Sequence, residues 1–198
     1  MDSESLWRAT LHDFNNLLAG LQGVLDLSDP RLPLDPRSRA RLECTLEDGK
    51  TLIAMARTMA LGRAQEAGLT SWTEWRAGLE ERLNPMALLY RCPIEVLDMG
   101  GSESSWPMPV FQDWAATFTR QILPWAAPGP LQLQARAELD AWVLTWPGDA
   151  PIPGALDPEP TAERPRNLPG LWLYEMTGRL GVIVEREEQG LVARLPRP

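Results

Sequence analysis

The hydrophobic residues in the first third of the chain recur at alternating intervals of four and three positions. This spacing is typical of a helix that packs along another helix. It occurs in residues 4–27, at Trp7, Leu11, Phe14, Leu18, Leu21 and Leu25. It recurs in a second predicted helix that ends near residue 67, at Leu42, Leu46, Gly49, Ile53, Ala56 and Ala60. Asp35 followed by Pro36 is a typical helix start, so we predict a helical hairpin over residues 1–67.

The apolar stripe of each predicted helix is wider than one neighbouring helix covers. Leu17 and Val24 lie beside the first seam, and Leu52 and Met59 lie beside the second. A homodimer in which two hairpins form a four-helix bundle would bury these residues. The alternative is that the rest of the chain covers the extra surface.

After residue 70 the pattern changes to helices interspersed with short alternating segments. Helices are expected at residues 72–83, 110–125 and 170–180, and strands at residues 94–97, 131–136, 141–146, 182–186 and 191–195. We expect Asn84-Pro85 to end the first of these helices and the proline-rich residues 147–169 to form a long loop. The pattern predicts an α+β protein in which residues 70–198 form an α/β sandwich, with helices on one face of a mostly antiparallel sheet.

Composition restricts the partners and the compartment. The 198 residues carry a net charge of −8, which disfavours nucleic acid and membranes as partners. The sequence shows no apolar run of the ~20 residues that a membrane span needs, and no secretion signal, so we expect a cytoplasmic protein. Cys44 and Cys92 lie in apolar surroundings without a metal-binding spacing, which favours buried thiols in a reducing compartment.

The chain is rich in tryptophan, with nine residues of this type. Four are expected in the core because of their helical or strand spacing: Trp72, Trp75, Trp114 and Trp142. Trp106 and Trp125 lie beside prolines near loop ends, and we expect them on a surface that meets a partner.

His12 is the only histidine, and it lies beside the seam of the first helix rather than in it. Asn16 and the small residues Ala19, Gly20 and Gly23 share its exposed face, so a partner can approach closely. Each of the two glycines costs the helix about 1 kcal/mol relative to alanine. Their presence within four residues therefore favours a functional role over chance. The predicted partner-binding residues are Arg8, Asn15, Ala19, Gly20 and Gly23.

The surroundings of His12 suit a nucleophile that accepts a phosphoryl group. An imidazole attacks phosphorus in its neutral form, which histidine populates near neutral pH. Asp13 can accept a hydrogen bond from one ring nitrogen, which fixes the tautomer and activates the other nitrogen. Asn16, one turn further on, can orient a phosphoryl group or a water. We therefore predict His12, Asp13 and Asn16 as the catalytic residues, with no metal or cofactor site in this chain.

The string His12-Asp13-Phe14-Asn15-Asn16-Leu17-Leu18 closely resembles the phosphoacceptor box of bacterial two-component sensor histidine kinases. In that family the box lies on the first helix of a dimerising hairpin, and an ATP-binding domain follows. Residues 70–198 resemble this domain in the order of their elements. The stretch Gly170-Leu171-Trp172-Leu173-Tyr174, continuing to Leu195-Pro196, resembles its last glycine motif, helix and hairpin.

The sequence departs from the family at the positions that correspond to its nucleotide-binding motifs. The family holds Mg²⁺ with an asparagine-bearing helix, whereas residues 110–125 contain no asparagine. Pro147, Asp149 and Pro151 stand where the family has an Asp-x-Gly-x-Gly motif, and Gly170 and Trp172 stand for a later glycine pair. Proline has no N–H to offer a phosphate, and an indole fills the space that a bare backbone leaves. The resemblance therefore implies a degenerate ATPase domain.

This combination resembles the kinase-derived histidine phosphotransferases of bacterial phosphorelays. The resemblance implies a protein that relays phosphoryl groups through His12 between aspartates of receiver domains, without ATP and with Mg²⁺ supplied by the receiver. Its partners would be response-regulator receiver domains or a hybrid histidine kinase. One alternative is a non-catalytic pseudokinase adaptor that binds a kinase or receiver, and another is a divergent active histidine kinase.

Overall fold

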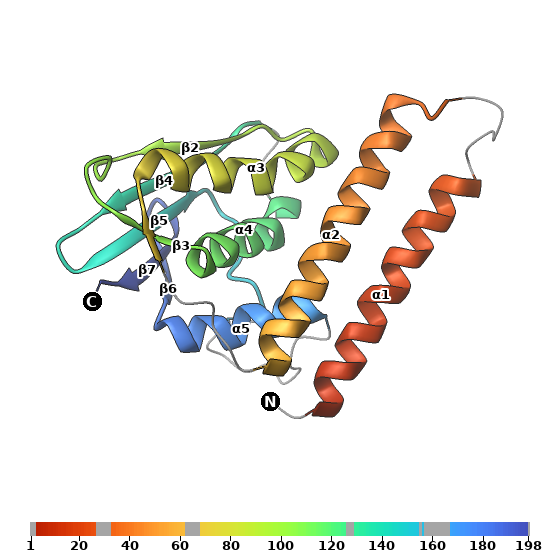
Figure 1. The fold of residues 1–198 in the computed structure, drawn as a ribbon. Coiled ribbons are helices and arrows are strands. Elements are labelled where there is room, and N and C mark those ends of the chain that lie inside the picture. The colour runs from red at the N-terminus through yellow and green to blue at the C-terminus, as the bar shows by residue number, and fades with distance from the viewer. Residues whose placement is uncertain are drawn as a thin grey trace. The chain divides into compact units, whose positions relative to one another are not determined.

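The computed structural model describes residues 3–26, 33–61, 68–125, 129–154, 156 and 167–197 (Figure 1). The chain forms two compact units. The first consists of Met1–Arg63 and Ala162–Trp172, and the second of Ala64–Thr161 and Leu173–Pro198. The predicted domain boundary between residues 67 and 70 stays a prediction, because residues 62–67 lie outside the described part.

The first unit contains the helical hairpin that the heptad spacing predicts. Helix α1 spans Ser3–Asp26 and α2 spans Pro36–Leu61. Asp35 caps α2, because its carboxylate accepts a hydrogen bond from the backbone N–H of Ser38 at 3.1 Å. Pro36 at the first helical position has no N–H to leave unsatisfied, so the two residues together start the helix.

The buried side of each hairpin helix differs from the predicted seam. Five heptad positions are more than half exposed: Trp7, Leu11, Leu18, Leu46 and Ile53. Positions beside the seam are buried instead, at Val24, Leu52, Met55 and Met59. The two helices approach at Leu17 and Gly49, where a Cβ on the glycine would lie 3.6 Å from Leu17 Cδ1. Because one hairpin supplies each helix with one neighbour, the rest of its wide apolar stripe stays exposed.

The second unit is built on a mixed five-stranded sheet. Its strands are β2 (Ile94–Asp98), β4 (Leu131–Ala137), β5 (Ala141–Pro147), β6 (Ile183–Glu187) and β7 (Gly190–Pro196). They lie in the order β2-β4-β5-β7-β6, with β2 parallel to β4 and all other neighbours antiparallel. This sheet confirms the predicted strands and the α+β class. Two short strands that the sequence did not predict, β1 (Gly68–Thr70) and β3 (Trp106–Met108), form a separate antiparallel pair.

Helices α3 (Trp72–Tyr90) and α4 (Val110–Ile122) pack together on one side of this sheet in Figure 1. A short 3₁₀ turn, η1 (Leu123–Trp125), extends α4, and the division between the two units falls within α5 (Leu168–Leu180). The prediction that Asn84-Pro85 ends α3 is wrong. The helix continues past Pro85 because the apolar residues that follow it keep the helical spacing, which outweighs one missing N–H.

The largest fully buried side chains of the second unit are tryptophans and phenylalanines. The predicted core residues Trp72, Trp75, Trp114 and Trp142 are confirmed as buried. Trp106 is fully buried as well, so its predicted surface role is wrong, whereas Trp125 is 59% exposed. Trp106 enters the core because β3 pairs with β1, and its ring centroid lies 4.7 Å from that of Trp75.

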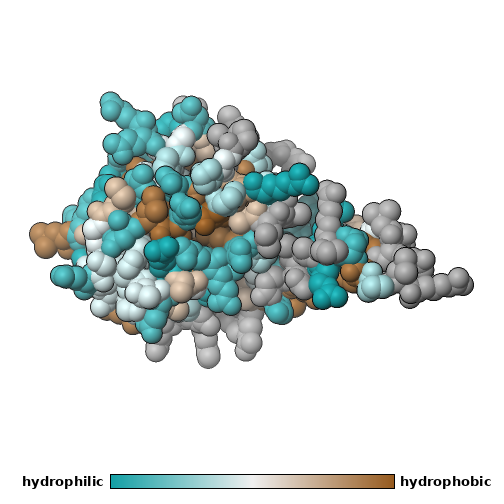
Figure 2. All heavy atoms as spheres, turned by 90° about the horizontal axis from the view of Figure 1, so that it is seen from above, coloured by the Kyte–Doolittle hydropathy of each residue, from teal (hydrophilic) through white to brown (hydrophobic). Residues whose placement is uncertain are grey.

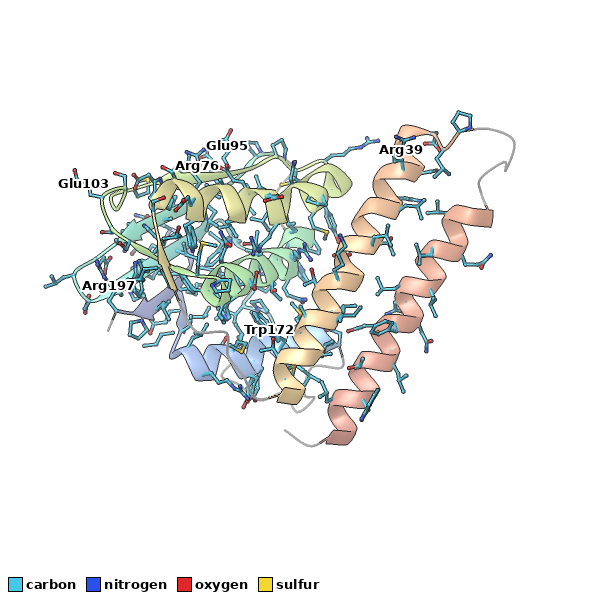
Figure 3. All side chains as sticks on the ribbon, viewed as in Figure 1. Arg39, Arg76, Glu95, Glu103, Trp172 and Arg197 are labelled. Carbon is cyan, nitrogen blue, oxygen red and sulfur yellow. The ribbon has the colours of Figure 1, made fainter. Side chains whose placement is uncertain are left out.

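Five buried indoles of this core, those of Trp75, Trp106, Trp114, Trp142 and Trp146, donate their N–H to an oxygen. Trp114 Nε1 donates to Thr177 Oγ1 at 2.8 Å, which joins α4 to α5. Trp146 Nε1 donates to Thr119 Oγ1 at 2.8 Å, which joins β5 to α4. At the end of the sheet, the guanidinium of Arg197 (labelled in Figure 3) lies 5.2 Å from the ring centre of Trp142.

Two further sequence predictions concern the cysteines and the membrane. Cys92 is a buried free thiol that donates to the carbonyl of Gly129 at 3.1 Å, while the side chain of Cys44 lies outside the described residues. Among the helices that the structure describes, none combines the length and the apolar character needed to span a membrane.

Candidate functional site

His12 lies in the middle of α1, and α1 carries its side chain outward. The imidazole is 57% exposed, while the neighbouring Asp13 side chain is only 10% exposed. Consecutive residues on a helix are about 100° apart, so one can face solvent while the next faces inward. The sequence thus presents an accessible ring directly beside a buried carboxylate.

The two oxygens of the Asp13 carboxylate have different partners. Oδ1 lies 2.9 Å from His12 Nδ1, and Oδ2 accepts a hydrogen bond from the backbone N–H of Leu168 at 2.6 Å. A carboxylate only accepts, so the short contact assigns the ring proton to Nδ1. His12 Nε2 then keeps its lone pair, and this is the nitrogen that can attack an electrophile.

The Leu168 N–H belongs to the first turn of α5, within the part of that helix that the first unit contains. Asn167 caps this turn, because its Oδ1 accepts from the N–H of Gly170 at 2.8 Å and its carbonyl accepts from the N–H of Leu171 at 3.1 Å. Asp13 and Asn167 therefore share the backbone donors that a helix start leaves unsatisfied. Sequence reasoning missed this contact, because Asp13 and Leu168 are 155 positions apart.

Asn16 lies one helical turn after the histidine, with its Nδ2 3.4 Å from His12 Nδ1. The amide nitrogen is a donor, so it competes with the Nδ1 proton for the same side of the ring. The carboxylate is nearer and charged, which makes its hydrogen bond the stronger of the two. Asn16 therefore lies against the ring without determining its tautomer while Asp13 is present.

The predicted partner-binding residues on α1 are exposed where the structure describes their side chains. Asn15, Ala19, Gly20 and Gly23 all lie on the surface. A Cβ at Gly23 would meet nothing within 4 Å, and one at Gly20 would lie 3.9 Å from the side chain of Thr45. Neither glycine is required by packing within the unit. The side chain of Arg8 lies outside the described residues.

Bulky aromatic side chains of α4 and β5 pack against one another in the second unit. On α4, the rings of Trp114 and Phe118 stack with their centroids 5.1 Å apart. The ring centroid of Trp146 in β5 lies 4.5 Å from that of Phe118. Pro147 ends β5. Trp172 (Figure 3), which belongs to the first unit, is buried within α5 rather than placed in a loop. The rings of Trp114, Phe118 and Trp146 and the proline ring of Pro147 supply no carboxylate for adenine and no free N–H for a phosphate, so these four residues offer no ligand to a nucleotide.

No group of three or more potential ligands among histidine, cysteine, aspartate and glutamate comes together in the described part of the chain to hold a metal ion. The second unit has a hollow of about 690 Å³ beside the second half of α3, lined by Glu80, Glu81, Asn84 and Arg91 among others. In Figure 2, hydrophilic residues surround a recess with hydrophobic residues on the surface of this unit. None of the predicted site residues lines this hollow.

Several solved structures of bacterial signalling proteins are similar in fold to this chain. Histidine kinase AdeS of Acinetobacter baumannii matches with a TM-score of 0.53 at 12% identity, over 93% of this chain and 94% of that one. A bacterial phosphotransferase matches with a TM-score of 0.54 at 14% identity, over 98% and 97%. The chain has the histidine kinase fold.

A third structure, histidine kinase ThkA in complex with the response regulator TrrA, matches with a TM-score of 0.52 at 9% identity. It covers 95% of this chain and 60% of that one. No protein-family model matches the sequence, and no curated protein matches it either. The similarity therefore resides in the arrangement of helices and strands rather than in sequence identity.

Proposed function

We propose that this protein is a histidine phosphotransferase that relays phosphoryl groups between receiver-domain aspartates through His12. The observation that carries this proposal is the exposed imidazole whose Nδ1 lies 2.9 Å from a buried carboxylate. That arrangement leaves Nε2 unprotonated and accessible, as a phosphoryl acceptor requires. The shared fold with histidine kinases and with a bacterial phosphotransferase supports the same kind of signalling chemistry.

The proposed reaction begins with attack of His12 Nε2 on the phosphorus of an aspartyl phosphate. The N–P bond forms as the bond from phosphorus to the aspartate oxygen breaks, and the aspartate leaves as a carboxylate. Nδ1 keeps its proton, so the ring becomes a phosphorylated imidazolium whose positive charge faces Asp13. The reverse step delivers the phosphoryl group to the aspartate of a second receiver. Positioning and neutralisation of charge supply most of the catalysis in such transfers.

The partner in this proposal is a response-regulator receiver domain or a hybrid kinase that carries one. ThkA, which shares the fold, is seen in complex with a response regulator. The receiver would supply Mg²⁺, and this chain would need no cofactor of its own. The exposed, small residues around Gly20 and Gly23 leave room for such a domain to approach His12.

The proposal includes a homodimer through the hairpin. Trp7, Leu11 and Leu18 on α1 and Leu46 and Ile53 on α2 are more than half exposed at heptad spacing. A second hairpin would cover these residues in a four-helix bundle.

A transfer assay tests the proposed function. Receiver domains encoded in the same genome are phosphorylated with labelled phosphate and mixed with the protein. Label should move to this chain, and the product should be labile to acid and stable to alkali, as a phosphoramidate is. The His12→Gln variant should accept no label while its circular dichroism stays unchanged, because an exposed side chain contributes little to folding. Equal labelling of His12→Gln would disprove a role for His12.

The second unit favours a relay without ATP over an active kinase. Trp114, Phe118 and Trp146 fill the region between α4 and β5. We expect no binding of ATP or ADP with Mg²⁺ by calorimetry at millimolar nucleotide. Saturable binding together with autophosphorylation of His12 would establish the kinase instead.

A pseudokinase adaptor is the second candidate, supported by the exposed helix surface around Gly20 and Gly23, which does not need a reactive histidine. The adaptor would bind a receiver or kinase without accepting label. Its output in cells would be the same in wild type and in His12→Gln.

A further inference from the structure

The two oxygens of the Asp13 carboxylate face groups that differ in their hydrogen-bonding capacity. The backbone N–H of Leu168, 2.6 Å from Oδ2, can only donate a hydrogen bond. His12 Nδ1, 2.9 Å from Oδ1, can donate or accept, depending on the tautomer of the ring. The fixed donor therefore orients the carboxylate, so that Oδ1 faces the imidazole and accepts from its Nδ1.

The Leu168 N–H is held firmly in place. Leu168 is fully buried, and Asn167 caps the same turn by accepting from the N–H of Gly170 at 2.8 Å. Asp13 itself is almost completely buried, so its carboxylate has little freedom to find water as a substitute partner. The first turn of α5 thus presents a buried donor in a capped turn to the Asp13 carboxylate.

We propose that the Leu168 N–H is a positioning group that, through Asp13, keeps the proton of His12 on Nδ1 and so leaves Nε2 free to accept phosphoryl. The start of α5 would then serve to set the tautomer of the phosphoacceptor within the first unit. This inference concerns the same site as the proposed phosphotransfer and rests on it for its biological meaning. The tautomer itself can be measured without any transfer.

The Asp13→Asn variant gives the decisive prediction. An asparagine has one oxygen and one NH₂ group, and the Leu168 N–H can face only the oxygen. The NH₂ group would then point at His12 Nδ1, on the side from which Asn16 Nδ2 already approaches at 3.4 Å. With two donors facing it, Nδ1 must become an acceptor, and the ring proton must move to Nε2. The nucleophilic lone pair is thereby lost, as in the wrong tautomer that follows the equivalent change in serine protease triads.

The tautomer can be read from ¹⁵N shifts of the imidazole, and the single histidine gives one unambiguous pair of ring signals. At a pH where the ring is neutral, the wild type should show Nδ1–H and the Asp13→Asn variant Nε2–H. Asp35→Asn makes the same chemical change at the cap of α2 and should leave the His12 signals unchanged. If Asp13→Asn keeps Nδ1–H, the inference is wrong, whatever the transfer assay shows.

Amide hydrogen exchange tests the hydrogen bond directly. The Leu168 amide should exchange slowly in the wild type and at least about tenfold faster in Asp13→Ala, because that variant removes its acceptor. Rapid exchange in the wild type would overturn the inference. Asn167→Ala should also speed Leu168 exchange, and Asn167→Ser, which restores a capping oxygen, should rescue it. Failure of that rescue would mean that the cap does not hold the donor in place.

The two proposals can fail separately. A tautomer switch in Asp13→Asn without any phosphotransfer by the wild type would leave the positioning intact and remove the proposed function. Phosphotransfer that stays at the wild-type rate in Asp13→Asn would show that Leu168 and Asp13 do not control the nucleophile.

Discussion

Leu17 of α1 lies against Gly49 of α2, so the two helices of the hairpin meet here at a residue without a side chain. A Cβ on Gly49 would lie 3.6 Å from Leu17 Cδ1, which is an ordinary contact distance. An alanine therefore fits at this position, and a longer side chain does not. The heptad spacing places both residues near the seam but does not reveal that they meet.

The first prediction follows from this contact. Gly49→Ala should stabilise the protein by up to about 1 kcal/mol, because it removes a glycine from a helix interior without a clash. Gly49→Leu should destabilise it by about 1–3 kcal/mol, because the larger side chain pushes Leu17 and α1 away. Urea denaturation measures both. Equal stability of the two variants would mean that α1 and α2 are not in contact here.

The second prediction concerns the exposed heptad positions. Leu18→Asp places a charge at a position that is 61% exposed in the single chain, so the hairpin itself should still form. The same charge would be buried and unpaired in a four-helix bundle, and the dimer should dissociate. Light scattering should give twice the 22.1 kDa chain mass for the wild type and the chain mass for the variant. A monomeric wild type would rule out the dimer.

The third prediction uses the helix start of α3. Glu74 accepts hydrogen bonds from the hydroxyls of Thr70 and Ser71 and from the Ser71 N–H, and these lower its pKa from the ordinary 4.5. A carboxyl whose pKa is lowered by folding stabilises the folded state above its unfolded pKa, and this stabilisation disappears as the pH falls through its folded pKa.

Glu74→Gln should therefore unfold at lower urea than the wild type at neutral pH. The difference should shrink as the pH falls below 4.5. Glu103→Gln is a control on an exposed loop of the same unit (Figure 3). It should change neither the urea concentration at which the protein unfolds nor the dependence of that concentration on pH. A difference that is independent of pH would show that the charge of Glu74 does not cap α3.

The sequence predicts the regular elements well because each has a clear period over many residues. α1 and the strands β4 and β5 follow their predicted ranges closely, and α2 begins where it was predicted to begin, while its predicted end near residue 67 lies outside the described residues. The β1–β3 pair could not be predicted, because each strand has three residues and no measurable alternation. The burial of Trp106 depends on that pair and was missed with it.

The candidate site is predictable only as far as it is local. His12, Asp13 and Asn16 lie within five consecutive positions, so helical geometry alone brings them together. The second partner of Asp13 comes from the far end of the sequence, and no periodicity links it to α1. The continuation of α3 past Pro85 was missed because the proline was interpreted as a helix end, although the apolar spacing continues beyond it.

The last prediction separates stability from partner recognition at Gly23. A Cβ there meets nothing within 4 Å, so Gly23→Ala should stabilise α1 by about 1 kcal/mol through helix propensity alone. If this face receives the receiver domain, the added methyl group should lie in the interface and slow phosphotransfer while the melting temperature rises. Gly49→Ala gains the same propensity at the contact with α2 and should leave transfer unchanged. Equal transfer rates in Gly23→Ala and Gly49→Ala would show that the small residues near His12 do not admit the partner.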